Sequence, residues 1–295
     1  MMHKIQTVGI YSPGDMGQAV GKLLAERGLR VIAGLDGRSE RTRHLAQEAG
    51  IEDVGALTAL VQEADLLLSI LVPDQAVNAA QAVAQAVTAT PRDLLYVDCN
   101  AIAPQTVQIV DRIITAAGAR FVDASIIGPP PAQTRKPGTT RFYASGPDVA
   151  TFARLRDYGL EIIDLGSVIG QASAIKMCYA ALTKGLTALC TELLTAAEVF
   201  GVSGALAQEL EGSQAMLYKQ MQQALPGMPA KAHRWIGEME EIAQTFGAIG
   251  LTPHILTGAA DIYRFVNTTP LAHLTPEDPK PTFETMIKTL ANQLR

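Results

Sequence analysis

The first part of the sequence alternates short apolar runs with stretches of helical periodicity, and this alternation restricts the fold more than any other feature. The apolar runs are five to seven residues long and carry few polar side chains, as expected for strands that helices cover on both faces. Strands that alternate with helices indicate βαβ units and a parallel sheet. We predict strands at 7–11, 30–35, near 53, 66–72, 94–99, 120–125, 141–146 and 161–166, and intervening helices at 16–28, 41–49, 57–63, 74–87 and 104–117.

From Gly170 onward the strand pattern disappears and helical periodicity continues alone. The predicted helices lie at about 170–200, 203–224, 229–247, 252–266 and 282–294. We therefore predict two domains, a doubly wound, mainly parallel α/β Rossmann domain at 1–166 and an all-α substrate and dimerisation domain at 167–295. The apolar helix near 177–199 is too long for a small helical domain to cover fully, which favours a homodimer.

Composition argues against several classes of function. The chain has 24 Lys and Arg against 29 Asp and Glu, scattered without a basic cluster, so a nucleic-acid partner is not expected. Its three cysteines lack metal-ligand or disulfide spacing, which fits a reducing compartment. The chain starts without a signal-peptide pattern, and its long apolar helix carries charged residues. We expect a cytoplasmic protein with a small-molecule substrate, without a metal site or a membrane partner.

The segment GIYSPGDMG (9–17) lies between the first predicted strand and the first predicted helix. It contains a variant of the phosphate-binding pattern G-x-G-x-x-G, with Ser12 in the place of the first glycine, followed by Gly14 and Gly17. Gly14 lets the backbone approach a pyrophosphate, and Gly17 lets the helix pack on the strand. The N-terminus of the helix offers free N–H groups to phosphate. The predicted nucleotide contacts are Ser12, Pro13, Gly14, Asp15 and Met16.

The second predicted strand ends at LDGRSERTR, where NAD sites usually place an acid for the ribose hydroxyls, and Asp36 could serve. Gly37, Arg38 and Ser39 follow, and Arg41 lies close behind. Two guanidinium groups and a hydroxyl suit a 2′-phosphate. The alternative is a solvated helix start capped by Ser39. We predict NADP as the cofactor, with NAD less favoured.

Seven segments, taken together in their order and spacing, are more specific than any single motif. They are SPGDMG (12–17), DGRS (36–39), ILVPD (70–74), DCNAIAP (98–104), DASIIGPPP (123–131), GQASAIKMCYA (170–180) and RWIGEMEEIA (234–243). In these segments the chain resembles the β-hydroxyacid dehydrogenase and 6-phosphogluconate dehydrogenase superfamily, in particular the subgroup with a distinct C-terminal helical domain once labelled as of unknown function. The resemblance implies an NAD(P)-dependent oxidoreductase that moves hydride between the cofactor and a short hydroxy acid or its oxo form.

The resemblance also implies roles for single residues. Further cofactor contacts would come from Leu71, Val72, Pro73 and Asn100. The segment DASIIGPPP matches the family segment that holds the substrate carboxylate, and here it presents Ile127, Gly128 and Pro129. Because Pro129 has no backbone N–H, one donor is missing, and the substrate pocket is expected to differ from that of the family.

Lys176 aligns with the catalytic lysine of the family. The family's asparagine pair, three and four residues later, is replaced by Tyr179 and Ala180. Tyr179 and Thr183 share a helix face with Lys176 and are the polar groups that could stand in. A solvated surface lysine is the alternative, but the apolar flanks of Lys176 predict partial burial.

The segment RWIGEMEEIA resembles the C-terminal helix that closes over the cleft in the family, without the family's Lys-Asp pair. His233 and Trp235, at its start, could reach a substrate or could simply pack. The leading function is oxidoreduction of a CH–OH group, with Lys176 as general acid and base. Reduction of an imine is a second possibility, which Tyr179 keeps open. A non-catalytic NADP-binding protein is a third, and the altered substrate loop would suit it.

Overall fold

The computed structural model describes residues 5–132, 139–275 and 277–294. The chain divides into two compact units, Met1–Met177 and Cys178–Arg295, here called the N-terminal and C-terminal units. The division falls inside helix α7 (Gln171–Phe200). The domain boundary predicted from the sequence lies shortly before this helix, at the point where strands give way to helices.

The N-terminal unit contains an eight-stranded sheet in the order β3-β2-β1-β4-β5-β6-β7-β8. The strands are β1 (Thr7–Ile10), β2 (Arg30–Ala33), β3 (Glu52–Asp53), β4 (Leu66–Ser69), β5 (Leu95–Asp98), β6 (Arg120–Ile127), β7 (Arg141–Ser145) and β8 (Glu161–Asp164). Neighbouring strands from β1 to β6 are parallel. β7 runs antiparallel to β6, and β8 follows the direction of β7. The sequence pattern of β7 and β8 predicts that they are strands, but it does not predict whether they run parallel or antiparallel to β6. An antiparallel return needs no crossover helix, and none is described between β6 and β7.

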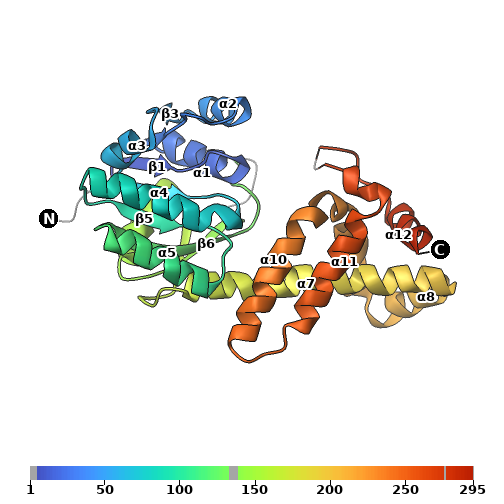
Figure 1. Ribbon diagram of the computed structural model, residues 1–295. Coiled ribbons are helices and arrows are strands. Elements are labelled where there is room, and N and C mark those ends of the chain that lie inside the picture. Colours follow the sequence, from blue (N-terminus) through green and yellow to red (C-terminus); the bar gives the residue numbers. More distant parts are fainter. Residues whose placement is uncertain (1–4, 133–138, 276, 295) are drawn as a thin grey trace. The chain divides into compact units, whose positions relative to one another are not determined.

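Helices cover both faces of this sheet (Figure 1). They are α1 (Asp15–Glu26), α2 (Glu40–Glu48), α3 (Leu57–Glu63), α4 (Ala76–Ala89), α5 (Pro104–Ala116) and α6 (Val149–Phe152). One core joins α1, α2 and α6 to one face, and a second core joins α3, α4 and α5 to the other. Successive strand residues serve both cores, as Tyr96 and Val97 show. Two-sided burial is the reason that these strands are apolar throughout, and the fold is the predicted doubly wound Rossmann architecture.

The strand order determines where this sheet can bind a ligand. From β1 the chain builds outward through β2 and β3, and it then returns to β4 on the other side of β1. The carboxyl ends of β1 and β4 therefore meet at a topological switch point, which is where open α/β sheets bind their ligands. The turn after β1 and the loop after β4 both begin at this edge.

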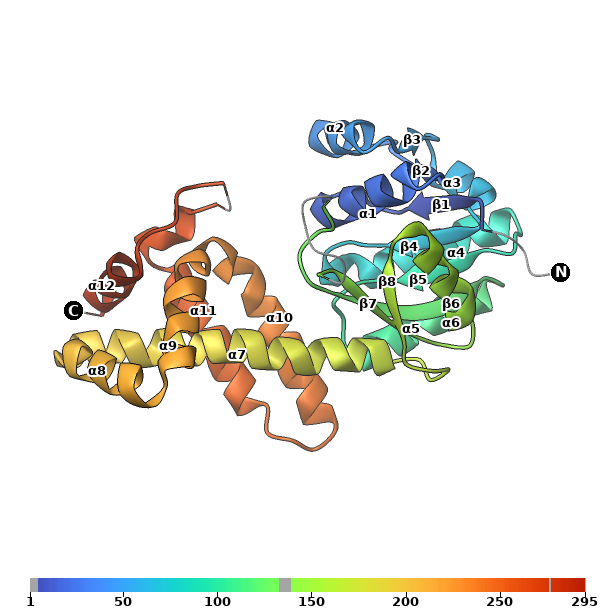
Figure 2. The ribbon, with the colours of Figure 1, turned by 180° about the vertical axis from the view of Figure 1, so that it is seen from behind.

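In the described residues of the C-terminal unit, the regular secondary structure consists of helices. After α7, which Figure 2 shows as one long helix, follow α8 (Ser203–Ser213), α9 (Ala215–Ala224), α10 (Pro229–Ala248), α11 (His254–Asn267) and α12 (Phe283–Gln293). The single helix predicted at 203–224 is two helices, because Gln214 leaves helical geometry at φ −136° and ψ 35°. Tyr263 of α11 is buried, and its hydroxyl donates to the Lys184 carbonyl of α7 at 2.6 Å. Among the described residues, no helix has the length and apolarity of a membrane span.

Candidate cofactor and active site

The turn after β1 has the geometry that a phosphate-binding turn needs. The Gly14 N–H donates to the Ser12 carbonyl at 2.9 Å, and α1 begins at the next residue. A Cβ on Gly17 would lie 2.3 Å from the Ser12 oxygen, so only glycine lets α1 pack this closely. A Cβ on Gly14 would meet nothing within 4 Å, so the space beside this backbone is open. The residues present therefore fit a phosphate group approaching the helix N-terminus. Of the other residues predicted here, Pro13 is buried, Met16 is half-buried and Asp15 is exposed.

A hollow of about 290 Å³ lies at the ends of β1 and β2. It is lined by Tyr11, Gly34, Asp36, Gly37, Arg38, Leu57 and Leu60. Arg38 donates from Nη2 to the Tyr11 carbonyl at 3.1 Å, and its guanidinium carbon lies 5.2 Å from the centre of the Tyr11 ring. The acid that suits a ribose and the guanidinium that suits a 2′-phosphate thus line the same hollow.

Arg41 and Ser39 have other partners. Arg41 forms an exposed ion pair with Asp15, with 2.6 Å between Nη2 and Oδ1. Ser39 caps α2, because its Oγ accepts a hydrogen bond from the Thr42 N–H at 3.3 Å. Ser39 thus has the capping role that the sequence analysis gave as the alternative to cofactor binding. Neither Ser39 nor Arg41 lines the hollow. The two arginines predicted to act together are therefore held by different groups.

Asn100 is buried and attaches the loop after β4 to the end of β5. Its Oδ1 accepts from the Leu71 N–H at 2.7 Å. Its Nδ2 donates to Ser69 Oγ at 3.1 Å and to Asp98 Oδ2 at 3.0 Å. The loop residues predicted to contact the cofactor are half-buried or exposed: Leu71, Val72 and Pro73. Asn100 therefore positions this loop, a role that the sequence pattern did not indicate.

Four buried polar side chains lie in register across neighbouring strands at this edge of the sheet. They are Ser69 of β4, Asp98 of β5, Asp123 of β6 and Ser145 of β7. No role was predicted for any of them, although a signal was present. Asp98 and Asp123 each follow directly on apolar residues of a predicted strand, so their carboxylates are expected to be buried. Carboxylates are rarely fully buried without a partner.

The Asp123 carboxylate caps the N-terminus of α7. Its Oδ2 accepts from the N–H groups of Gly170 and Ser173 at 2.9 and 3.1 Å, and its Oδ1 accepts from Ser173 Oγ at 2.8 Å. Ser145 Oγ donates to the same carboxylate and accepts from the Ala172 N–H. These bonds satisfy N–H groups that a helix start leaves without partners, and a negative charge there is favoured by the helix dipole.

Lys176 lies one turn beyond this cap. Its Nζ donates to the Ile126 carbonyl of β6 at 2.6 Å. β6 therefore holds α7 through Asp123 and holds the lysine side chain through Ile126. Lys176 is half-buried, as predicted, and its ammonium lies near the carboxyl end of β6.

The predicted substrate segment begins where β6 ends. Ile127 is the buried last residue of the strand. Gly128 has φ +124°, and a Cβ there would lie 2.1 Å from the Thr139 carbonyl oxygen, so glycine is required at this exit. The Pro129 carbonyl accepts from Thr140 Oγ1 at 2.6 Å. Gly128 and Pro129 thus have a structural reason, because both contact the residues that lead into β7.

The remaining candidates belong to the C-terminal unit. Tyr179 is 45% exposed, and Thr183 Oγ1 donates to the Tyr179 carbonyl within α7. His233 is exposed on α10, whereas Trp235 is half-buried with its ring centre 5.3 Å from that of Tyr263. Within this unit Trp235 therefore packs against Tyr263, which is the alternative to a substrate contact. Of the three cysteines, Cys178 on α7 is exposed, whereas Cys99 and Cys190 are buried.

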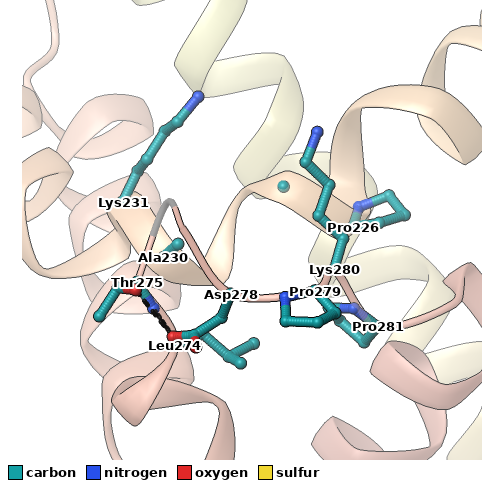
Figure 3. A pocket seen from close by; sticks show the side chains of 10 residues that line it. Pro226, Ala230, Lys231, Leu274, Thr275, Asp278, Pro279, Lys280 and Pro281 are labelled. Atoms are coloured by element: carbon teal, nitrogen blue, oxygen red, sulfur yellow. Dashed lines mark hydrogen bonds between the residues drawn. The ribbon is translucent and has the colours of Figure 1, made fainter.

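The C-terminal unit has a hollow of its own, of about 190 Å³ (Figure 3). Lys231 and Lys280 line it, and in Figure 3 their ammonium ends point to the same side. Asp278 lines it too, and its Oδ2 accepts from the N–H and the hydroxyl of Thr275. None of the site residues predicted from the sequence lines this hollow. Among the residues that the structure describes, no cluster of His, Cys, Asp or Glu is arranged to hold a metal ion.

The buried carboxylates predict an unusual dependence of stability on pH. Burial is the main cause that raises the pKa of Asp98 from 3.8 to about 7, and the charge of Asp123 adds to it. Between these two values the folded state holds a proton that the unfolded state releases. This contribution to stability is therefore full below about pH 4 and is lost as the pH rises through about 7.

Asp98→Asn removes this titration. We expect the melting temperature of the variant, relative to that of the wild type, to rise as the pH goes from about 5 to about 8. Thermal melts of both proteins at several pH values measure the difference, and Asp74→Asn on the exposed surface controls for the loss of one charge. A difference that stays constant with pH would show that Asp98 is ionised in the folded protein throughout this range.

Comparison with known proteins relates this site to a family. Residues 5–176 match the family model described as the NAD binding domain of 6-phosphogluconate dehydrogenase, and residues 197–266 match a domain of unknown function, DUF1932. A solved structure of a conserved protein of unknown function, described as structurally similar to 3-hydroxyacid dehydrogenases, is 30% identical with a TM-score of 0.71, over 88% of this chain and 96% of that one.

Two curated proteins are similar to parts of this chain. An uncharacterized 28.5 kDa protein of Methanothermus fervidus is 26% identical over 204 residues, which are 69% of this chain and 76% of the relative. The mitochondrial 3-hydroxyisobutyrate dehydrogenase of Drosophila melanogaster is 27% identical over 150 residues, which are 50% of this chain and 41% of the relative. The N-terminal unit is thus an NAD(P)-binding domain on a dehydrogenase scaffold, and the chain belongs to the family defined by the NAD binding domain of 6-phosphogluconate dehydrogenase.

Proposed function

We propose that this protein is an NADP-dependent oxidoreductase that transfers hydride between the nicotinamide and a small hydroxy acid or its oxo form, with Lys176 as general acid and base. The observation that carries the proposal is the placement of Lys176. The Asp123 cap fixes the start of its helix, and its Nζ lies 2.6 Å from the Ile126 carbonyl near the carboxyl end of β6. Ligands of α/β sheets bind outside this edge. One of the similar proteins is a 3-hydroxyisobutyrate dehydrogenase, and the hydroxy acid in its name supports a hydroxy acid as the substrate class.

The residues of the N-terminal unit would hold NADP as follows. The open turn at Ser12–Met16 would take the pyrophosphate, and the loop positioned by Asn100 would lie along the cofactor. Arg38 would meet the 2′-phosphate from its hollow. The Arg41 guanidinium offsets the negative charge of Asp15 at the start of α1, where an unpaired carboxylate would repel phosphate. When bound, the nicotinamide supplies or accepts the hydride.

Lys176 would donate a proton to the substrate oxygen in reduction and would accept it in oxidation. Reduction of a carbonyl carbon leaves negative charge on its oxygen, and this oxygen must gain a proton. The ammonium of Lys176 can donate that proton while the Ile126 carbonyl keeps Nζ in place. In the oxidative direction, the neutral amine takes the proton from the substrate hydroxyl. A lysine can serve both directions because it releases a proton far more readily than an arginine does.

Lys176→Ala should lower turnover by about 10²- to 10⁴-fold, the usual contribution of a positioned general acid, and should leave NADPH affinity nearly unchanged. Lys176→Arg should not restore turnover. Loss of NADPH absorbance with a panel of oxo acids, semialdehydes and imines measures turnover, and NADPH fluorescence measures binding. Near-full turnover by Lys176→Ala would contradict the assignment and direct attention to Tyr179 or His233. Turnover of imines alone would favour imine reduction, and NADPH binding without any turnover would favour a non-catalytic role.

Arg38→Ala should weaken NADP binding by about 10- to 100-fold, because charge-assisted hydrogen bonds to a phosphate are lost, and should change NAD binding little. Arg112→Ala is the matched control, since Arg112 is an exposed arginine on α5 and does not line the hollow. Titrations of both cofactors against both variants measure the effect. An equal loss for NADP and NAD in Arg38→Ala would place Arg38 away from the 2′-phosphate.

We also propose that the protein is a homodimer that forms through α7. Apolar residues follow one another on this helix at alternating spacings of four and three: Leu182, Leu186, Leu189, Leu193, Ala196 and Phe200. Leu182, Leu189 and Phe200 are 64%, 55% and 77% exposed. A repeat of 3.5 residues on an exposed face is the pattern of a coiled-coil seam, and a second copy of the same helix complements it.

Light scattering at micromolar concentration should therefore give about twice the mass of one 31.3 kDa chain. The double substitution Leu182→Glu and Leu189→Glu places charges in the seam and should give monomers that remain folded. Leu251→Glu is the control, because Leu251 is a similarly exposed leucine outside α7. A monomeric wild-type protein would contradict this assembly.

A further inference from the structure

The antiparallel pair β6 and β7 presents a polar strip on one face of the sheet. Its register pairs are Asp123 with Ser145, Ser125 with Tyr143, and Ile127 with Arg141. Side chains of paired residues point to the same face, and those of alternate residues along a strand do too. The hydrogen bonds from Gly170 and Ser173 to Asp123 show that α7 begins over this face. The strip therefore extends from the cap of α7 to the exit of β6.

The Nε of Arg141, at the end of this strip, has no acceptor among the residues that the structure describes. This Nε is buried, and no ion pair of Arg141 occurs in the described part of the chain either. Two other arginines of the same unit do have acceptors. Arg156 donates from Nε to the Ile162 carbonyl at 2.8 Å, and Arg120 pairs with Asp93 and Asp148. A desolvated guanidinium N–H without an acceptor lowers stability, so a purely structural reason for Arg141 is weak.

The register of Arg141 places it beside the strand end that Lys176 contacts. Residues paired across antiparallel strands have Cα atoms about 4.5–5.5 Å apart, so Arg141 stands beside Ile127. Lys176 donates to the carbonyl of the preceding residue, Ile126. The nearest carboxylate of the strip, Asp123, is already engaged by four hydrogen bonds. Two cationic residues therefore stand at the exit of β6, Lys176 through its hydrogen bond and Arg141 through its register.

The backbone at this exit has few donors of its own. Residues 129, 130 and 131 are all proline and have no N–H. An anion bound beside Lys176 would therefore depend on side chains for its hydrogen bonds. A guanidinium presents its donors in a planar fork that matches the two oxygens of a carboxylate.

We propose that Arg141 binds the carboxylate of the substrate and thereby selects acids over their uncharged analogues. This proposal deepens the proposed function, because Lys176 marks the reacting centre in both. The carboxylate would supply an acceptor to a guanidinium whose Nε has none among the described residues. Arg141 thus holds one end of the substrate while Lys176 serves the oxygen at the other.

A structural role and a binding role for Arg141 make opposite predictions for stability. If the guanidinium held the fold together, its removal would lower the melting temperature. Because its Nε has no partner in the described residues, Arg141→Met, which keeps the length of the side chain and removes the charge, should leave the melting temperature unchanged or raise it. A lowered melting temperature would overturn the proposal.

Binding is tested without turnover by malonate, a small dicarboxylate. Malonate should raise the melting temperature of the wild type above that in sodium chloride of equal ionic strength, because a ligand that binds only the folded state stabilises it. Arg141→Met should lose this rise. Arg112→Gln, which changes an exposed arginine on α5, should keep it. An equal rise in wild type and Arg141→Met, or no rise in the wild type, would refute the proposal. Equal losses in both variants would do so as well.

Kinetics adds a second readout once an oxo acid from the panel is found to turn over. Arg141→Met should raise KM for that acid by about 10- to 150-fold and change kcat much less. KM for the corresponding amide should stay the same. A variant that still prefers the acid to the amide would overturn the proposal. If no substrate turns over, the proposed function fails and the malonate experiment still decides the role of Arg141.

Discussion

The Asp123 carboxylate is the interaction on which the site depends. This buried carboxylate accepts four hydrogen bonds, and two of them come from N–H groups of the helix start that would otherwise be buried without partners. The same bonds determine the direction and the starting point of α7. With the helix start fixed to β6, Lys176 one turn later can reach only a limited region at the end of that strand. The placement of the proposed acid and base therefore follows from the satisfaction of backbone donors.

The edge of the sheet combines two kinds of electrostatic environment. In the buried part of this edge, desolvation raises the pKa values of Asp98 and Asp123. Around its rim, the side chains of Arg38, Lys176 and Arg141 are positive. The chain as a whole is acidic, with a net charge of −5. The three cationic side chains suit the anionic cofactor and the anionic substrate that we propose.

Much of the architecture was predictable from the sequence because burial on two faces makes a strand apolar along its whole length. The strands of the sheet follow from that rule, and Gly17 of the first turn follows from the close approach of α1 to the backbone of Ser12. What could not be predicted depends on register. Ser69, Asp98, Asp123 and Ser145 are far apart in the sequence and become neighbours only when four strands align. Local competition was the second obstacle: Ser39 serves α2 as a cap, and Asn100 serves a loop, because the nearest backbone groups claim their hydrogen bonds.

The exposure of Cys178 has a practical consequence. The other two cysteines are buried, so a thiol-reactive reagent would modify the native chain at this single place, two residues after Lys176 on the same helix. A fluorophore or spin label attached there would need no engineered residue. The native protein thus carries its own reporter position for following, by spectroscopy, how the surroundings of α7 respond to cofactors and acids.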